Sequence, residues 1–237
     1  MSDKYLYLAI NLLSISIPFV FSFYKPAPFY KTWKHLSVAI VLPAAIFIGW
    51  DEYFTRLGVW GFNPRYLSGI YIGSLPIEEI LFFVCIPYAC LFTYHALNYL
   101  VKMDYLGVYK TQITKVLIIL LAGLGGIYYD RLYTSVTFFG LAIFLTLLLV
   151  LVKPVYLGRF YFAFAIILIP FFMVNGILTG SFIPEEVVWY NSMEQLNIRM
   201  GTIPVEDTFY GMLLILMNVS ILEFLQKRSA SSVPSKS

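Results

Sequence analysis

Long apolar stretches make up most of this chain, and only short polar segments separate them. Seven stretches are long enough to cross a bilayer as helices, since the hydrocarbon core requires about 20 apolar residues per helix. They cover residues 5–23, 36–54, 76–99, 113–129, 133–152, 160–179 and 204–225. Only 12% of the 237 residues are charged, about half the share in a soluble domain. The sequence therefore predicts an all-α integral membrane protein with seven transmembrane helices.

A seven-residue motif at the start of the third predicted helix recurs at the start of the seventh. The first copy is Gly73-Ser74-Leu75-Pro76-Ile77-Glu78-Glu79, and the second, 128 residues further on, is Gly201-Thr202-Ile203-Pro204-Val205-Glu206-Asp207. The same offset relates Phe62 to Tyr190, Asn63 to Asn191 and Phe82 to Tyr210. We therefore expect two copies of one structural unit, each with two adjacent acids at the mouth of an apolar helix.

The number of helices fits this repeat. A unit of three helices ends on the opposite side of the membrane from where it begins, so one extra helix is needed to make the second unit parallel to the first. We expect a 3+1+3 arrangement with a first repeat over 1–100, a linker helix within 101–132, a second repeat over 133–226 and a disordered, Ser-rich tail over 227–237. Parallel repeats of this kind are related by a pseudo-two-fold axis along the membrane normal.

Lysine and arginine residues concentrate on one side of this arrangement. The loops on the side of the C-terminus, together with the tail, contain Lys25, Lys31, Lys34, Lys102, Lys110, Lys115, Lys153, Arg159, Lys227, Arg228 and Lys236. The other side contains Lys4, Arg56, Arg65, Arg131 and Arg199. Because loops rich in Lys and Arg stay in the cytoplasm, the C-terminus is expected inside and the N-terminus outside. Both acid motifs would then lie toward the outer leaflet.

The motif has a simple structural interpretation. Ser74 and Thr202 are suitable N-caps, and Pro76 and Pro204 suit a first helical turn. Acids in that turn gain about 0.3–1 kcal/mol each from the helix dipole. This explains one acid per helix. Two acids in each copy, beside an apolar run, indicate a function as well, because acids at membrane depth face the bundle interior and mark functional sites.

The four acids of the two motifs (Glu78, Glu79, Glu206 and Asp207) cannot all be ionised if they face one another in a pocket of low dielectric constant. Some would hold a proton while others are charged, which supplies a general acid and a general base in one site. The sequence shows no dinucleotide-binding fingerprint and no phosphate-binding loop. It therefore indicates proton donation and proton removal, without a cofactor or a metal.

These motifs resemble those of the lycopene cyclase domain. The similarity rests on Trp60-Gly61-Phe62-Asn63 with Leu75-Pro76-Ile77-Glu78-Glu79-Ile80-Leu81-Phe82-Phe83, and on Trp189-Tyr190-Asn191 with Ile203-Pro204-Val205-Glu206-Asp207. This domain is that of the flavin-free, membrane-embedded lycopene cyclases, which occur as two small subunits or as two fused copies. The resemblance covers about 1–226. The tryptophan lies three residues before Asn63 but two before Asn191, so the two tryptophans are not expected to have equivalent roles.

The resemblance implies an enzyme of carotenoid biosynthesis. The reaction would be a non-redox, acid–base catalysed cyclisation of the linear ends of lycopene to β-rings, via γ-carotene to β-carotene. Glu78 or Glu206 would donate a proton, and Glu79 or Asp207 would accept the released proton or stabilise the cation. Positioned acid–base groups contribute about 10²–10⁴-fold to a rate. The resemblance also implies a lipid-soluble substrate, no cofactor and a multi-pass protein of a bacterial cytoplasmic membrane.

Aromatic residues near the acids are candidates for substrate binding, because aromatic faces stabilise cations. These candidates are Trp60, Phe82, Tyr190 and Tyr210. Asn63 and Asn191 would either orient the acids or form turns. Asp51 and Glu52 end the second helix on the same side as the motifs. They would either join the site or be solvated at the helix end, and solvation is the simpler interpretation. His95 and Glu223 are expected to be a packing residue and a surface residue.

The same features also bear on other classes of membrane protein. A retinal-binding photoreceptor or pump needs a lysine in its last helix, and none lies between Pro204 and Gln226. A proton-coupled transporter would use the same intramembrane carboxylates and is the alternative function. The net charge is only +3 and its bases are spread over several loops, which argues against a nucleic-acid partner. The sequence predicts no particular oligomeric state.

Overall fold

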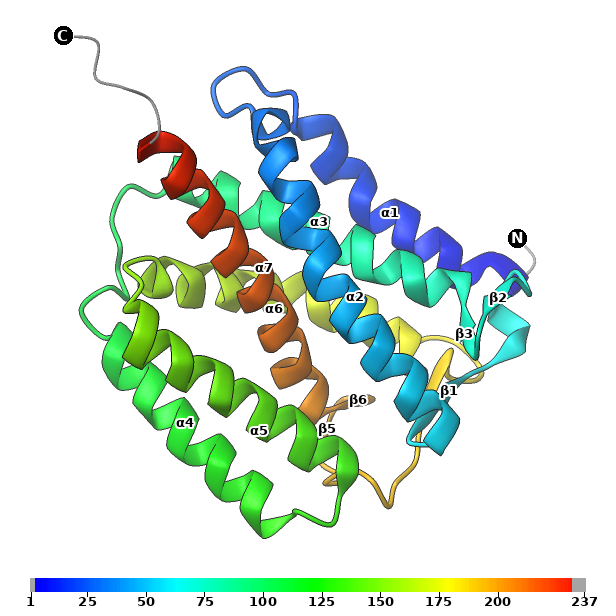
Figure 1. The fold of residues 1–237 in the computed structure, drawn as a ribbon. Helices are drawn as coiled ribbons and strands as arrows, with labels where there is room; N and C mark the ends of the chain where they lie inside the picture. The colour runs from blue at the N-terminus through cyan, green and yellow to red at the C-terminus, as the bar shows by residue number, and fades with distance from the viewer. Residues whose placement is uncertain (1–2, 232–237) are drawn as a thin grey trace, which may run out of the picture.

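The computed structural model describes residues 3–231, and seven long helices make up most of it (Figure 1). These helices are α1 (Leu6–Phe21), α2 (Trp33–Leu57), α3 (Ile77–Leu100), α4 (Lys110–Ile127), α5 (Leu132–Leu147), α6 (Leu157–Leu178) and α7 (Val205–Ser231). Short helical turns lie at η1 (Asp3–Tyr5), η2 (Phe29–Thr32), η3 (Pro64–Tyr66) and η4 (Leu148–Val152). All seven helices are long and apolar enough to cross a membrane. The predicted all-α membrane fold is confirmed.

Most helix ends lie within about three residues of the predicted ends, with two exceptions. The last turn of the predicted fifth helix is the π-helical segment η4. Helix α7 continues to Ser231, so the prediction of a disordered tail is wrong for 227–231. These residues include good helix formers and bases, which stabilise a helix C-terminus. The remainder of the predicted tail, 232–237, lies outside the described residues.

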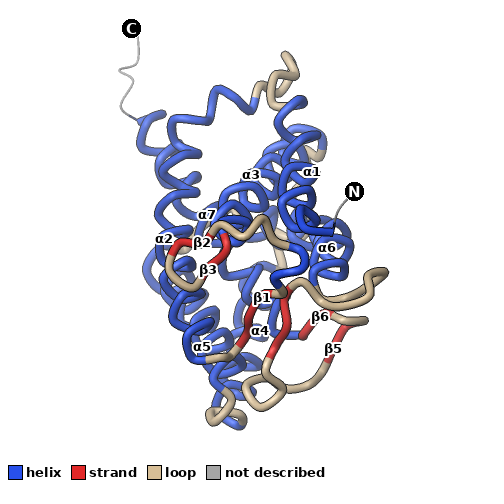
Figure 2. Tube along the Cα trace, turned by 90° about the vertical axis from the view of Figure 1, so that its right-hand side faces the viewer, coloured by secondary structure: helices blue, strands red, loops and turns tan. Residues whose placement is uncertain are grey.

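Three pairs of short strands, which the sequence did not reveal, lie at one end of the bundle (Figure 2). They pair β1 (Trp60–Phe62) with β4 (Val188–Tyr190), β2 (Tyr71–Ile72) with β3 (Leu75–Pro76), and β5 (Arg199–Met200) with β6 (Ile203–Pro204). Each strand has only two or three residues, too few for an alternating pattern to be visible. They organise the two long loops that precede α3 and α7.

The antiparallel pairing of β1 with β4 joins the two repeats directly. Its register pairs Gly61 with Trp189, and these residues are 128 apart. On either side, Trp60 pairs with Tyr190 and Phe62 pairs with Val188. Trp60 therefore pairs with the residue equivalent to Phe62, and Phe62 pairs with the residue equivalent to Trp60. A two-fold axis through the Gly61–Trp189 pair requires this exchange.

The two acid motifs begin as tight hairpins. Gly73 and Gly201 sit in the turns between β2 and β3 and between β5 and β6, with φ of +67° and +66°, a conformation that favours glycine. The predicted N-caps are wrong, because α3 begins only at Ile77 and α7 only at Val205. Ser74 instead donates hydrogen bonds to Glu52 from its backbone N–H (2.9 Å) and its Oγ (2.7 Å).

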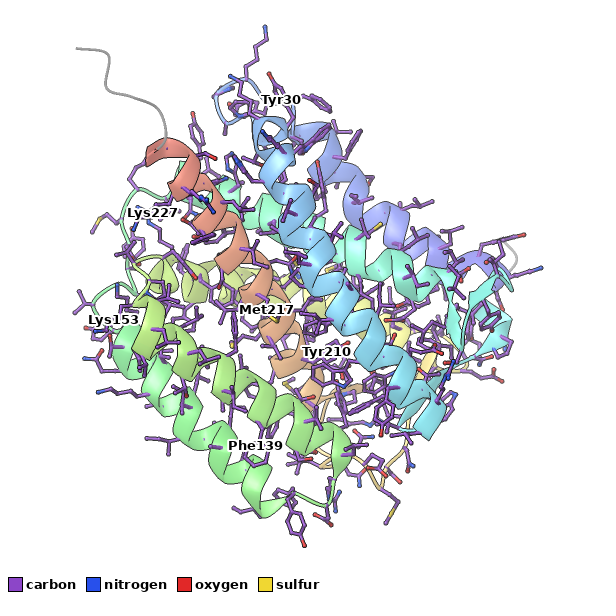
Figure 3. The ribbon with its side chains drawn as sticks, viewed as in Figure 1. Tyr30, Phe139, Lys153, Tyr210, Met217 and Lys227 are labelled. Atoms are coloured by element: carbon purple, nitrogen blue, oxygen red, sulfur yellow. The ribbon has the colours of Figure 1, made fainter. Side chains whose placement is uncertain are left out.

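Both motifs lie at the same end of the bundle, because α3 and α7 start there. Helix α1 packs along α3, and α2 and α5 pack against α7, while α4 packs on the outer side of α5 (Figure 1). Tyr210 lies between α2 and α7 toward the strand-bearing end, whereas Lys153 and Lys227 lie at the opposite end (Figure 3). Cys85 and Cys90 are buried free thiols.

Candidate active site

A cavity of about 540 Å³ lies inside the bundle between α1, α3, α6 and α7. Its polar end is formed by Tyr7, Asp51, Trp60, Glu79, Tyr133, Tyr190, Asp207 and Tyr210. The remainder of its wall is mostly apolar and comes from α1, α3, α6 and α7, with Phe62 of β1 and Val188 of β4. The cavity therefore combines a cluster of carboxyl, phenol and indole groups with a long hydrocarbon-like extension.

The apolar part of the cavity opens sideways. Along α3 its wall extends from Glu79 to Thr93, about 20 Å at the rise of an α-helix. Leu13 on α1 and Met173 on α6 also belong to the wall, yet their exposed fractions are 71% and 68%. Both helices are predicted to span the membrane, so the outer surface at this gap faces lipid. An opening at this place would give an apolar molecule in the bilayer access to the cavity.

One acid from each motif lies at the polar end of the cavity. Glu79 accepts a hydrogen bond at 2.5 Å from the Tyr7 hydroxyl. Asp207 accepts one at 2.5 Å from Tyr133 and one at 2.9 Å from Tyr190. Glu79 and Asp207 are close enough to interact electrostatically. Each repeat thus contributes one phenol-bound carboxyl to a single site.

Tyr190 lies in β4, outside the predicted spans. Burial and, secondarily, the neighbouring Asp207 carboxyl raise the pKa of its phenol well above the usual range. The hydroxyl therefore keeps its proton and acts as a hydrogen-bond donor to Asp207.

The other acid of each motif fixes the loop that precedes its helix. Oε1 of Glu78 accepts a hydrogen bond from the backbone N–H of Ser68, and Oε1 of Glu206 accepts one from Leu196, both at 2.7 Å. The donors Ser68 and Leu196 are 128 residues apart, as are the acceptors Glu78 and Glu206. Both acids are fully buried, but neither forms part of the cavity wall. The structure therefore places two of the four motif acids at the cavity and two behind it.

A third carboxyl at the polar end comes from outside the motifs. Asp51 on α2 is only 2% exposed, so the expectation that it is solvated at a helix end is wrong. The Trp60 indole N–H donates a hydrogen bond to its Oδ1. Its neighbour Glu52 behaves differently, because that carboxyl accepts bonds from Ser74 and Arg56 on the surface.

Aromatic rings surround the three carboxyls. Trp60 lies 5.0 Å from Tyr133 and 6.2 Å from Tyr210, measured between ring centroids. Tyr133 stacks on Tyr190 at 5.8 Å, and Phe82 packs at 6.3 Å against Tyr7. All four aromatic residues singled out in the sequence (Trp60, Phe82, Tyr190 and Tyr210) line the cavity. Such a lining suits a transient cation.

Other predicted residues lie away from the cavity. The Oδ1 atoms of Asn63 and Asn191 accept hydrogen bonds from the backbone two residues on, so of the two interpretations the geometry favours turn residues. Trp189 is 40% exposed, unlike Trp60, in line with the unequal spacing of the two tryptophans. His95 packs against Phe29. Glu223 accepts a hydrogen bond from Tyr94.

Sequence reasoning missed Tyr7 and Tyr133, and it gave a place of Asp51 in the site only as the less favoured alternative. Tyr7 and Tyr133 begin the first helix of each repeat and bind equivalent acids, but they are 126 residues apart rather than 128. A search at a variable offset would have paired them. Among the described residues, no group of three or more His, Cys, Asp or Glu side chains is arranged to hold a metal ion.

Fold and cavity together define a multi-pass membrane protein with a largely apolar chamber that has carboxyls at one end. The model of the lycopene cyclase family matches residues 4–97 and 130–225, which is most of the chain. The chain belongs to the lycopene cyclase family. Neither this family nor the relatives described next carries a description as a transporter, so that alternative has no support.

Two similar proteins are fungal. A "Bifunctional lycopene cyclase/phytoene synthase" of Aspergillus niger is 32% identical over 69 residues, which is 28% of this chain and 12% of that protein. The protein of the same name from Aspergillus oryzae is 30% identical over 76 residues, 32% of this chain and 13% of that protein. The matched segments thus span about an eighth of these relatives. No solved structure matches the chain.

Proposed function

We propose that this protein is a lycopene β-cyclase, which converts the linear ends of lycopene to β-rings, via γ-carotene to β-carotene. The observation that carries the proposal is the meeting of Glu79 and Asp207, one from each repeat, at the polar end of one lipid-accessible apolar cavity. An enzyme that moves protons on a hydrocarbon needs both features. Family membership supports the same reaction.

The reaction begins with a protonated carboxyl at the polar end of the cavity. Its proton adds to the terminal double bond of the substrate, and a neighbouring double bond supplies the electron pair that closes the six-membered ring. A carboxylate in the same cluster then removes a proton from the ring cation, and those C–H electrons form the ring double bond. Atoms and electrons balance within the substrate, so the net change is an isomerisation without a redox partner.

The residues around the acids provide what the cation requires. Trp60, Tyr133, Tyr190 and Tyr210 line the polar end of the cavity, next to the carboxyls where charge would develop. Cation–π attraction contributes ~2 kcal/mol or more in a desolvated site. The apolar wall keeps water away from the cation, which prevents its capture as an alcohol.

The single polar end implies that one end of the substrate reacts at a time. A carotenoid is about as long as the hydrocarbon layer is thick, ~30 Å, whereas the α3 side of the cavity extends about 20 Å. The distal end would project between α1 and α6 into the lipid. The monocyclic product then has to leave and re-enter in reverse before the second ring forms.

We also infer the organisation in the membrane. The proposed units are the two three-helix repeats over 1–100 and 133–226 with a linker helix within 101–132, as the shared register of β1 and β4 supports. The distribution of Lys and Arg supports an outer location of the acids and a cytoplasmic C-terminus, in a bacterial cytoplasmic membrane.

The proposal is tested by expressing the chain in cells that accumulate lycopene and analysing their carotenoids by chromatography. We expect monocyclic product first and dicyclic product later. A double variant, Glu79→Gln with Asp207→Asn, serves as the control at equal membrane content and should leave lycopene unchanged. If the wild-type protein reaches the membrane and no cyclic carotene forms, the proposal is rejected.

A further inference from the structure

We propose that Asp51, which lies outside both acid motifs, is the group that gives the proton that starts the cyclisation. This inference rests on the proposed function and names the acid within it. It concerns the one carboxyl of the cavity whose counterpart in the other repeat is not an acid, because position 179 is Thr179.

The position of Asp51 is defined by contacts from two elements. Its side chain projects from α2 into the wall that also contains Glu79 and Asp207, and it interacts electrostatically with Glu79. The indole N–H of Trp60 on β1 binds Oδ1. The other oxygen, Oδ2, is buried and has no hydrogen-bond partner among the described residues.

The three carboxyls differ in how well their anions are stabilised. Asp207 accepts bonds from two phenols, one on each oxygen, and Glu79 accepts one phenol bond. An ionised Asp51 would leave one buried oxygen without any donor, and burial of such a charge is far costlier than burial of the neutral acid. When three adjacent carboxyls share fewer than three negative charges, the proton therefore resides on Oδ2 of Asp51.

A proton at this place suits the first step of the reaction. No oxygen or nitrogen of the described residues competes for it. Oδ2 is buried, so the carboxyl has to rotate about its Cβ–Cγ bond, a torsion with a broad range in Asp, to turn the proton toward the substrate. The bond from Trp60 to Oδ1 withdraws electron density from the carboxyl and favours proton release. The double bond of a substrate pressed against this wall is then the available base.

The cycle closes without an outside co-reactant. The O–H bond of Asp51 breaks as a C–H bond forms at the substrate terminus, and Asp51 becomes a carboxylate. Asp207 or Glu79 removes the proton from the ring cation. That proton then returns to Asp51 within the cluster, and the starting protonation state is restored.

The second repeat has no equivalent donor. At the 128-residue offset Asp51 corresponds to Thr179, whose hydroxyl bonds to Thr202, and Trp60 corresponds to Val188. Thr179 is not part of the cavity wall. The two halves of the site therefore have different roles, with the donor on the side of the first repeat.

The test compares Asp51→Asn, Asp51→Glu, Trp60→Phe and the matched control Thr179→Val, each at known membrane content, with lycopene supplied in liposomes. Asp51→Asn keeps an oxygen for the indole but has no acidic proton, so we expect kcat to fall at least about 10²-fold with KM nearly unchanged. Asp51→Glu restores an acid and should exceed Asp51→Asn about tenfold or more. Trp60→Phe keeps the acid and should lose less than Asp51→Asn. Thr179→Val should remain near the wild-type rate.

The outcomes separate the two proposals. An inactive wild-type protein in intact membranes contradicts the cyclase function itself. An active wild-type protein with Asp51→Asn above a tenth of its rate overturns the assignment of Asp51. The assignment also fails if Trp60→Phe is as inactive as Asp51→Asn, since that result indicates a purely positional pair. If Asp51→Asn does not accumulate, a well-folded but inactive Asp51→Glu decides against the assignment.

Discussion

The surroundings of the two acid motifs are alike behind the cavity and different inside it. In both copies the first acid accepts a hydrogen bond from a backbone N–H at 2.7 Å, and a phenol from the first helix of the repeat donates to the second acid at 2.5 Å. One difference behind the cavity is that Glu206 also accepts a bond at 2.6 Å from the Thr134 hydroxyl. Within the cavity, the second copy adds Tyr190 beside Asp207, whereas the first adds the pair of Asp51 and Trp60.

This comparison separates what the repeat preserves for folding from what the site needs for chemistry. The hairpins, the loop hydrogen bonds and the helix starts are duplicated, and they place two carboxyls at the same depth. Two acids in identical surroundings would have the same proton affinity, so neither would be favoured as proton donor or acceptor. The unequal neighbours supply a difference in proton affinity, which is the condition for an acid and a base in one site.

The largest expected effect comes from the two acids that meet in the cavity. Glu79→Gln and Asp207→Asn should each lower turnover about 10²–10⁴-fold, because each removes a charge or an exchangeable proton at the reacting atoms. Carotenoid product per unit of membrane protein is the measurement. A single variant that keeps more than a tenth of the activity would show that one repeat suffices and that the composite site is wrong.

The phenols should produce a smaller and unequal effect. Tyr7→Phe removes the hydroxyl bound to Glu79, whereas Tyr190→Phe leaves Asp207 bonded to Tyr133. Hydrogen bonds to charged groups contribute about 1.5–3 kcal/mol, so we expect Tyr7→Phe to lose about tenfold or more in kcat. Tyr190→Phe should lose less. The reverse order, measured in the same liposome assay, would assign the more demanding role to Asp207.

The fold could be predicted from the sequence because apolar length and charge leave few solutions for a membrane chain. The site was predicted only in part. The motif acids were found through their repetition, but which acid of each pair faces the cavity depends on the rotation of α3 and α7 about their axes. Strands of two or three residues are also too short for a sequence pattern to predict them.

Asp51 also shows that the sequence does not reveal which side chain of a helix faces the cavity. On the sequence it adjoins Glu52 at the end of an apolar helix, and both acids had the same interpretation. One helical step of about 100° between neighbours turns Asp51 into the bundle and Glu52 toward Arg56 and Ser74 on the surface. The hydrogen bond from Trp60 of β1, nine residues further along the chain, is what distinguishes Asp51 from Glu52.

Glu78 and Glu206, the first acids of the motifs, test whether the duplicated hydrogen bonds behind the cavity serve folding rather than catalysis. The sequence alone suggested Glu78 and Glu206 as proton donors, but the structure leads us to expect that Glu78→Gln and Glu206→Gln stay within a few fold of the wild-type rate. Each amide oxygen still accepts the loop N–H. Glu78→Ala should instead lower stability by about 1–3 kcal/mol, because a buried N–H loses its partner. Thermal unfolding in detergent and the liposome assay measure the two effects. A 10²-fold loss in a stable Glu78→Gln protein would return the donor role to this residue.

The smallest expected effect concerns the asparagines of the two loops. Asn63 and Asn191 each accept a bond from the backbone two residues on, at 3.1 and 3.0 Å, but only Asn63 also donates to Glu185. Replacement by Ala should cost about 0.5–1.5 kcal/mol of stability for each lost bond, and slightly more at Asn63 because it loses two. Turnover at a temperature well below unfolding should not change, since neither side chain lines the cavity. A tenfold slower reaction in Asn191→Ala, without a loss of thermal stability, would mean that the loop of the second repeat orients the acids during turnover. The duplicated loops would then contribute to catalysis as well as to folding, which contradicts the comparison.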